Sequence, residues 1–408
     1  MLRVDAVNVK EISCLTFEGR NLEDLCRKYA GNLPRYTSYP TALEFQEVSR
    51  PSVAESALAE VASDGVPLSL YVHIPFCESL CYFCACNKII TQDESLKEEY
   101  LELLKAELGL IQESYGGIPP ISQVHLGGGS PSYLSTNQLQ RLCDILESHL
   151  EILPNAEKSI EADPRTFDRD KAALLYSRGF TRVSLGVQDF DPMVQDIVNR
   201  RQPYEMTVDA ISYLNEIGFN GINLDLIYGL PGQTITSFRS TIERLIGIKP
   251  DRIAMYGYAH VKWKVKVQHV LRKHGVPGPL ERISLFVMAV EMLTDAGYDY
   301  IGLDHFAMPD DELSQACKEK RLRRNFMGYT TIKGGGVLGL GLSSISDLSG
   351  VIYQNFSDLG SYRNMLGKKV LPVRRAIERT WEDKVRASII ENIMCNRGVS
   401  LKDLISVY

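Results

Sequence analysis

Short apolar runs alternate with amphipathic stretches along most of the chain, beginning near residue 65. The apolar runs are rich in Val, Ile and Leu and almost continuous, which is typical of strands buried on both faces. The strands predicted in this way are Leu68–Ile74, Gln123–Leu126, Lys158–Ala162, Arg182–Val187, Gly221–Ile227 and Arg252–Tyr258.

The stretches between these strands have the periodicity of helices. The clearest one starts near Ser95 and places a single apolar stripe on Leu96, Tyr100, Leu104, Leu108 and Ile111. Further helices are predicted at Asn137–Leu150, Asp168–Ser177, Met206–Ile217, Ser237–Ile246 and Leu280–Leu293. Six β-α units in succession imply an α/β fold with a parallel sheet, either open or curved into a barrel. In both arrangements ligands bind at the carboxyl ends of the strands.

The composition is that of a globular protein. A chain of 408 residues holds two or three domains at roughly 150 residues each. Its formal charge of -6 and its lack of a basic arm argue against a nucleic-acid partner. No apolar run approaches the roughly 20 residues that span a bilayer, and the N-terminus lacks the apolar core of a secretory signal. We therefore expect a cytoplasmic protein with no membrane partner.

Four cysteines, Cys77, Cys81, Cys84 and Cys86, follow the first predicted strand within ten residues. The spacing of three and then two residues lets one loop place three thiolates around an iron–sulfur cluster. Three thiolates would leave one iron open to a cofactor or substrate. The alternatives are zinc or inert thiols, but zinc usually takes a second Cys/His pair from another segment, and none follows. We interpret Cys86 as a packed thiol rather than a fourth ligand.

Glycine and polar residues lie at the carboxyl ends of the other predicted strands, where ligands are expected. They are Gly127–Gly129, Glu161, Asp163, Gln188, Asp189 and Asp225. Glycines let the backbone approach a ligand closely, and Glu161 could accept hydrogen bonds from ribose hydroxyls or an ammonium group. Taken singly, the glycines are equally explained by a tight turn, and a salt bridge is the favoured explanation of Glu161. No acid–base role is assigned to His73, His125, His260 or His305, because a lone histidine on a strand is more often a hydrogen-bonded core residue.

The cysteine spacing, with the aromatic Phe83 before the third cysteine, resembles the radical S-adenosylmethionine (SAM) superfamily. The chain is still more similar to the oxygen-independent coproporphyrinogen III oxidases, in ordered stretches from residue 34 to about 346. These include Pro34–Phe45, Tyr71–Cys77, Cys84–Lys88, Gly127–Pro131, Ser159–Arg165, Gly186–Phe190, Asn223–Pro231, Asn325–Thr331 and Ser343–Ser346. Cys86 separates the chain from related haem chaperones, which keep three cysteines.

This resemblance implies a partial (β/α)6 barrel, a [4Fe–4S] cluster on Cys77, Cys81 and Cys84, and two SAM molecules. It assigns the first SAM to Tyr71, Gly128, Glu161 and Ile345. It assigns the second to Phe83, Gly129, Ser130, Gln188, Arg200, Asp225 and Ala259, where Ser130 keeps the hydroxyl of the family's threonine.

The resemblance also implies the oxidative decarboxylation of coproporphyrinogen III to protoporphyrinogen IX by a monomer, with a flavodoxin or ferredoxin as electron donor. Arg35, Tyr36, Ser38 and Tyr39, together with Thr37, are expected to fold back across the barrel mouth and bind the substrate's carboxylates. A radical methyltransferase or cyclopropanase paralogue and a non-enzymatic haem chaperone are the alternative functions.

Three segments are expected: an N-terminal extension (1–64) that contributes to the active-site mouth, the barrel with its extension (65–370), and a short, truncated C-terminal helical segment (371–408). Within the barrel segment, Lys262, Lys264 and Lys266 alternate with apolar residues. We interpret them as the solvated face of an exposed strand, and a carboxylate clamp is the alternative.

Overall fold

The computed structural model describes residues 16–17, 20–29, 38–48, 52–261 and 265–400. Its centre is one 13-stranded sheet in the order β12-β13-β11-β10-β9-β8-β7-β4-β16-β17-β18-β19-β3. The strands are β3 (Gln46–Glu47), β4 (Leu68–Ile74), β7 (Pro120–Gly128), β8 (Glu151–Ala162), β9 (Arg182–Gln188), β10 (Gly221–Tyr228), β11 (Arg252–Gly257), β12 (Asp299–Gly302), β13 (His305–Ala307), β16 (Gly336–Leu340), β17 (Ile345–Leu348), β18 (Val351–Asn355) and β19 (Val373–Glu378).

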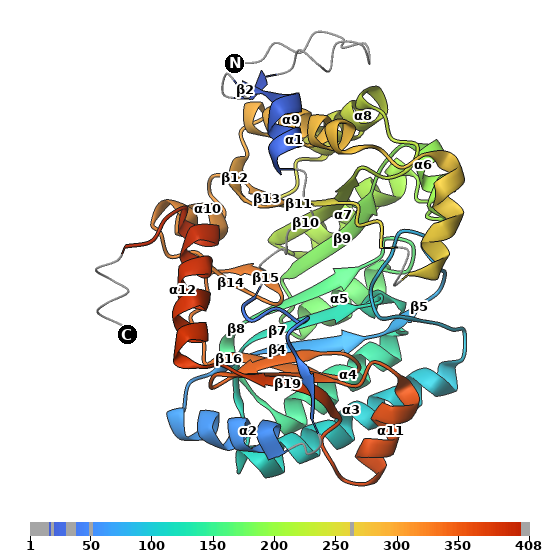
Figure 1. Cartoon of the computed structure of the whole chain (residues 1–408). Coiled ribbons are helices and arrows are strands. Elements are labelled where there is room, and N and C mark those ends of the chain that lie inside the picture. The colour runs from blue at the N-terminus through green and yellow to red at the C-terminus, as the bar shows by residue number, and fades with distance from the viewer. Residues whose placement is uncertain (1–15, 18–19, 30–37, 49–51, 262–264, 401–408) are drawn as a thin grey trace.

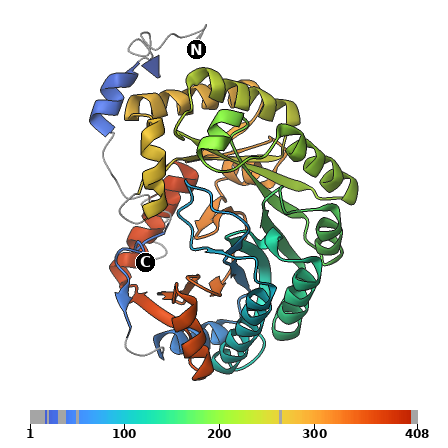
Figure 2. The same cartoon turned by 90° about the vertical axis from the view of Figure 1, so that its right-hand side faces the viewer.

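Pairing is parallel from β11 to β16 and antiparallel at both ends of the sheet. The predicted α/β fold with a parallel sheet is therefore confirmed. Within the described residues the two edge strands, β12 and β3, do not pair with each other. Figure 2 shows the strands following a curve, with helices along its outer side.

The connecting helices are α2 (Ser52–Asp64), α3 (Glu94–Tyr115), α4 (Thr136–His149), α5 (Arg169–Ser177), α6 (Pro192–Ile197), α7 (Tyr204–Ile217), α8 (Ile235–Ile248) and α9 (Pro279–Asp295). Strand β4 shows how the core forms. Its residues Leu68, Leu70, Val72 and Ile74 are fully buried in the same apolar core as the stripe of α3. Because side chains alternate along a strand, Ser69, Tyr71 and His73 lie on the opposite, inner face.

The parallel strand β16 is absent from the sequence prediction. It contains Gly336 and Gly339, and glycine lowers the strand signal of a short segment. The structure explains Gly339, because a Cβ there would lie 2.6 Å from the carbonyl oxygen of Ile345. The close approach of β17 to β16 therefore requires a glycine.

A buried carboxylate joins helix α3 to the strands beside it. Glu107 accepts hydrogen bonds from the Gly341 amide (2.9 Å), the Asn355 side-chain amide (2.5 Å) and the Tyr362 hydroxyl (2.5 Å). Burial raises the pKa of Glu107 to about 7, although these hydrogen bonds oppose the shift. The network fixes the loop after β16 against α3 and α11 (Leu359–Gly367).

Smaller elements complete the described part of the chain. They are β1 (Thr16–Phe17), β2 (Arg20–Asn21), α1 (Leu22–Tyr29), β5 (Phe76–Cys77), β6 (Ile89–Ile90), η2 (Pro131–Tyr133), η3 (Lys266–His274), α10 (Glu312–Lys318), β14 (Arg323–Asn325), β15 (Gly328–Thr330) and α12 (Trp381–Asn396). In Figure 1, α12 lies beside the hairpin of β14 and β15. Among the described helices, none combines the length and the apolarity that crossing a bilayer requires.

The two terminal segments meet in the main sheet, because β3 from residues 1–64 pairs with β19 from residues 371–408. The expected strand around the three lysines is wrong at Lys266, which is exposed at the start of the helix η3. Gln268 of that helix accepts a hydrogen bond from the Val261 amide at 2.7 Å. Lys262 and Lys264 lie outside the described residues.

Candidate active site

The cysteine loop leaves the carboxyl end of β4 and is held at several points. Strands β5 and β6 pair at its two ends. In the middle, the Tyr82 amide donates to the Val198 carbonyl (3.0 Å), and the Asn199 side-chain amide donates to the Leu80 carbonyl (2.8 Å). The loop is therefore anchored on the segment that follows α6.

The thiols of Cys77, Cys81 and Cys84 face one cavity of about 360 Å³, which Cys86 also lines. The glycine turn after β7 forms its adjoining wall. A Cβ on Gly129 would lie 2.5 Å from the Pro75 carbonyl oxygen and 3.0 Å from the Cys77 sulfur. Gly128 has φ of +122°, and a Cβ there would lie 2.8 Å from the His73 ring. Both positions must therefore be glycine for the turn to fit against the cysteine loop.

The thiols differ in their readiness to ionise. A hydrogen bond from Cys86 and the nearby charge of Lys88 lower the pKa of Cys84 to about 6, although burial opposes this. Burial raises the pKa of Cys77 to about 12. The Lys88 ammonium also donates to the Cys84 carbonyl at 2.9 Å. Cys86 thus supports the Cys84 thiolate as a hydrogen-bond donor, and our interpretation of Cys86 as a non-ligand stays a prediction.

The donor set fits an iron–sulfur cluster. A structural zinc site usually takes four protein ligands that converge on one point. The three thiols instead surround a shared cavity, as thiolates do around a larger inorganic cluster.

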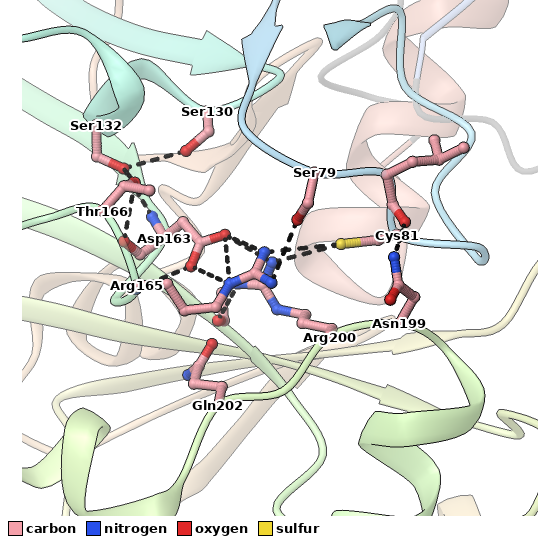
Figure 3. A network of polar contacts seen from close by, with 12 residues as sticks. Ser79, Cys81, Ser130, Ser132, Asp163, Arg165, Thr166, Asn199, Arg200 and Gln202 are labelled. Atoms are coloured by element: carbon pink, nitrogen blue, oxygen red, sulfur yellow. Dashed lines mark hydrogen bonds and ion pairs between the residues drawn. The ribbon is translucent and has the colours of Figure 1, made fainter. Parts of the chain in front are cut away.

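Two guanidinium groups lie against the Cys81 sulfur (Figure 3). Arg165 Nη2 is 3.9 Å and Arg200 Nη1 is 3.7 Å from this atom. Asp163 holds both arginines, since its Oδ2 accepts from Arg165 Nη2 at 2.7 Å and from Arg200 Nη1 at 2.9 Å. Burial by itself would raise the pKa of Asp163, but the two arginines outweigh it and lower the pKa to about 2. The carboxylate is therefore ionised, and it holds the two positively charged guanidinium groups beside the Cys81 sulfur.

Sequence reasoning missed Arg165, although it stands two residues after a strand-end aspartate. Arg200 was found only through the resemblance. Its Nη2 also donates to the Gly186 carbonyl at 2.6 Å, and a Cβ on Gly186 would lie 3.0 Å from that nitrogen. The glycine therefore makes room for the guanidinium.

Two carboxylates form the opposite wall of the cavity. Glu161 accepts from the Gly128 amide (3.1 Å) and lies 3.3 Å from His125 Nε2. Burial opposes its ionisation, but His125 and the Gly128 amide outweigh burial and lower the pKa of Glu161. Burial raises the pKa of Asp225 to about 7, and the Ser184 hydroxyl, which donates at 2.8 Å, opposes the shift only in part.

The structure brings most of the predicted cofactor residues to this one cavity. Those that line it are Phe83, Gly128, Gly129, Ser130, Glu161, Gln188, Arg200 and Asp225. Gln188 ends β9 with φ of +71°, a strained conformation for a non-glycine residue that is typical of ligand sites. The Ser130 hydroxyl lies 3.1 Å from that of Ser132.

Tyr71, Ala259 and Ile345 do not line the cavity but lie close to residues that do. The Tyr71 ring stacks on His125, the partner of Glu161, with centroids 5.9 Å apart. Ile345 begins β17, and its backbone lies against Gly339, the residue opposite Tyr71 in the pairing of β16 with β4.

Ala259 is connected to the cysteine loop by Gln268, which sequence reasoning also missed. The fully buried amide of Gln268 donates to the Phe83 carbonyl at 2.9 Å and to the Ala259 carbonyl at 3.0 Å. No sequence motif marks Gln268, because its partners are 9 and 185 residues away.

Of the predicted substrate residues, the two that the structure describes, Ser38 and Tyr39, do not line the cysteine cavity. Ser38 and Tyr39 line a different cavity, at the amino ends of β4 and β16. Arg35, Tyr36 and Thr37 lie outside the described residues.

The site consists of three thiols beside a glycine turn at the carboxyl end of a parallel sheet. A comparison with known families gives a consistent result. Residues 71–245 match the sequence model of the Radical SAM superfamily. The protein is therefore a radical SAM enzyme, the class that uses a [4Fe–4S] cluster and SAM.

Curated relatives identify the family within this class of enzymes to which the chain belongs. The oxygen-independent coproporphyrinogen III oxidase of Pseudomonas aeruginosa is 42% identical over 383 residues, which is 93% of this chain and 83% of the relative. That of Escherichia coli is 41% identical over 372 residues, covering 91% and 81%. The solved E. coli coproporphyrinogen III oxidase, described as a radical SAM enzyme, superposes with a TM-score of 0.87 at 39% identity over 91% of this chain and 85% of that one. The chain belongs to the oxygen-independent coproporphyrinogen III oxidase family, and the predicted family is confirmed.

Proposed function

We propose that this protein converts coproporphyrinogen III to protoporphyrinogen IX by two oxidative decarboxylations. The observation that carries the proposal is the cavity in which three thiols, the glycine turn and Glu161 meet. The substrate is suggested by relatives that carry this activity in their names and are about 40% identical over most of their length.

Cys77, Cys81 and Cys84 would hold the cluster. Together with SAM, the bound cluster supplies a 5′-deoxyadenosyl radical that can remove a hydrogen atom from an unactivated carbon. In the substrate, each reacting propionate loses one hydrogen atom to the radical, then carbon dioxide, and it passes one electron to an external one-electron acceptor, which leaves a vinyl group. The protein positions the cofactors and excludes water.

The chain's own residues prepare the cavity for a cationic, hydroxyl-rich ligand such as SAM. Glu161 is ionised and can accept from an ammonium group or from ribose hydroxyls, while the Gly128 amide fixes its orientation. We propose that Glu161, Gly128, Tyr71 and Ile345 serve the first SAM.

A second group of residues serves a second SAM in this proposal. Arg200 offers a guanidinium held by Asp163, and Asp225 offers a carboxyl group held by Ser184. The other members of this group are Phe83, Gly129, Ser130, Gln188 and Ala259. A flavodoxin or ferredoxin as electron donor, a monomeric state and a cytoplasmic location stay predictions.

The test is product analysis under anaerobic conditions. The reconstituted protein is incubated with SAM, dithionite and coproporphyrinogen III. Mass spectrometry should find a product in which two propionates have become vinyl groups, with 5′-deoxyadenosine formed alongside. Deoxyadenosine release without any mass loss from coproporphyrinogen III would contradict this substrate and favour the methyltransferase or cyclopropanase. No deoxyadenosine under any reducing condition would favour the haem chaperone.

A further inference from the structure

A second cavity, of about 690 Å³, lies on the inner side of the sheet at the end opposite the cysteine loop. Ser69, near the start of β4, and Gly336, at the start of β16, contribute to its wall. The hairpin of β14 and β15 and the helix α12 enclose it from other sides. Ser69 is five residues from Ile74, so about 16 Å of strand separates this cavity from the start of the cysteine loop.

The described lining of this cavity carries a positive excess in a chain whose net charge is -6. Its cations are Arg323, Arg324, Arg379 and Lys384, and its anions are Asp347 and Glu391. Arg379 is fully engaged by Asp347, with two hydrogen bonds of 2.5 and 2.6 Å. Glu391 accepts from the Arg324 backbone amide at 3.4 Å and is 3.9 Å from Arg323.

Arg324 is the cation best placed to receive a ligand. Among the described residues, its Nε and Nη1 atoms are shielded from solvent and have no hydrogen-bond partner. The guanidinium stacks on the Tyr329 ring, 4.7 Å from the centroid. A buried guanidinium without acceptors is costly, and an incoming carboxylate would remove that cost.

Aromatic rings connect this cavity to the cysteine cavity. Tyr256 lines the cysteine cavity and packs edge-on against His305, with centroids 6.0 Å apart. His305 in turn packs edge-on against Tyr329, 5.1 Å away. Arg324 is close enough to Tyr256 for its charge to favour the ionised phenol, although burial and nearby carboxylates raise the pKa of Tyr256 well above its usual value.

We propose that the second cavity binds carboxylate groups of the substrate, with Arg324 as the principal partner and Arg323 and Lys384 beside it. This inference rests on the proposed function and deepens it. A tetracarboxylate needs two environments. The reacting propionate must stay unpaired near the cofactors so that it can leave as carbon dioxide, whereas the propionates that do not react are best neutralised by fixed cations.

The positions of Ser38 and Tyr39, from the stretch Pro34–Phe45 that resembles the family, support the same assignment. Ser38 and Tyr39 line this cavity, and the Arg379 Nε atom donates to the Tyr39 carbonyl at 3.0 Å. Arg386 of α12 donates to the Tyr39 hydroxyl at 3.1 Å. The segment expected to contact the substrate is thus tied to the cationic cavity.

The test uses coproporphyrin III, the stable oxidised tetracarboxylate, as a fluorescent probe on the anaerobically reconstituted protein. Arg324→Met should weaken binding about 10- to 100-fold, as expected for the loss of a charge-assisted bidentate pair. Arg324→Lys, which keeps the charge but loses the fork, should fall between wild type and Arg324→Met. The tetramethyl ester of the probe should bind all variants alike.

The matched control is Arg321→Met. Arg321 lies two residues before β14, is 58% exposed in its side chain and pairs with Glu319 outside the cavity. This variant should bind the probe as wild type does. Iron content and the release of deoxyadenosine without substrate should be unchanged in every variant.

The outcomes separate the two proposals. Equal binding of coproporphyrin III by wild type, Arg324→Met and Arg324→Lys would overturn the cavity assignment, while vinyl formation by wild type would leave the proposed function standing. Binding that depends on Arg324 without vinyl formation would overturn the proposed function and keep a tetracarboxylate site. If Arg324→Met loses iron through misfolding, Arg324→Lys decides: affinity equal to wild type would reject the assignment.

Discussion

Asp163→Asn is the substitution that best tests the charge arrangement at the cysteine cavity. Asparagine has nearly the shape of aspartate and keeps the oxygen that accepts from the Arg165 amide and Nε, both at 3.0 Å. At the Oδ2 position, however, an NH2 group would face Arg165 Nη2 and Arg200 Nη1, which now donate to Oδ2 at 2.7 and 2.9 Å. The change therefore removes the negative charge that holds the two buried guanidiniums and places a donor against them.

The expected loss of stability follows from the pKa of Asp163 and from the burial of the triad. Lowering its pKa from 3.8 to about 2 corresponds to about 2 kcal/mol of folding free energy. Breaking a buried pair by removing one partner costs about 3–5 kcal/mol. A chain of this length unfolds with an entropy of about 0.9 kcal/mol/K, so a loss of about 2–5 kcal/mol lowers Tm by about 2–6 °C.

The assay is thermal unfolding of the cluster-free protein, followed by circular dichroism at pH 6, 7 and 8. The pKa of Asp163 is lowered on folding, so its stabilisation is complete above pH 3.8 and is lost only as the pH falls towards 2. The Tm difference should therefore be the same at all three pH values. Iron content after reconstitution should stay near that of wild type, because the three thiols are unchanged.

Glu216→Gln is the control for this measurement. Glu216 pairs with Arg169 at 2.6 Å, but both side chains are more than half exposed. Such a surface pair contributes about 0–1 kcal/mol, so Tm should fall by about 1 °C or less. If Asp163→Asn lowers Tm no more than Glu216→Gln does, or if its effect varies between pH 6 and 8, the reasoning about the buried triad is wrong.

Three further predictions concern the same cavity. Cys86→Ser should keep about four irons per chain after reconstitution, whereas Cys84→Ala should lose them; iron analysis showing the reverse would make Cys86 the ligand. Glu161→Gln should weaken SAM binding about tenfold in equilibrium dialysis with iron content unchanged, because a charged acceptor is lost, and unchanged SAM affinity would remove Glu161 from the site. Asp225 has its pKa raised to about 7 on folding, so wild type should lose stability relative to Asp225→Asn as the pH rises from 4 through 7. Thermal unfolding at pH 5 and pH 8 measures this difference, and an equal Tm gap at both values would contradict the buried position of Asp225.

Sequence patterns that span only a few residues were sufficient to predict many of the strands and helices. The strand Leu68–Ile74 was predicted with the bounds it has in the structure, because a seven-residue run of apolar character between turns has few other interpretations. The stripe of α3 was visible because helical spacing repeats over several turns. Strand β16 was not predicted, because Gly336 and Gly339 serve contacts with β17 that appear only after folding.

The residues of the candidate site also differ in whether the sequence could predict them. The cysteine loop could be recognised because Cys77, Cys81 and Cys84 lie within eight residues, at a spacing that suits an iron–sulfur cluster. The resemblance supplied Arg200, which no local pattern distinguishes from an ordinary surface residue, whereas the position of Gln188 at a strand end was visible in the sequence. Arg165 and Gln268 escaped both approaches, since their significance is a contact with a distant backbone or sulfur atom.

The sequence by itself determined that this chain forms a parallel α/β sheet with a cysteine loop at the carboxyl end of its first parallel strand. Hydrophobic periodicity and ligand spacing are local properties, and a linear sequence records them directly. Only the tertiary structure decided which charges meet. It brought Asp163, Arg165 and Arg200 to Cys81, and it separated Ser38 and Tyr39 from the cysteine cavity and put them beside the cations near Arg324. These contacts join segments tens to hundreds of residues apart. Burial then makes the electrostatic interactions between them stronger than they would be in water.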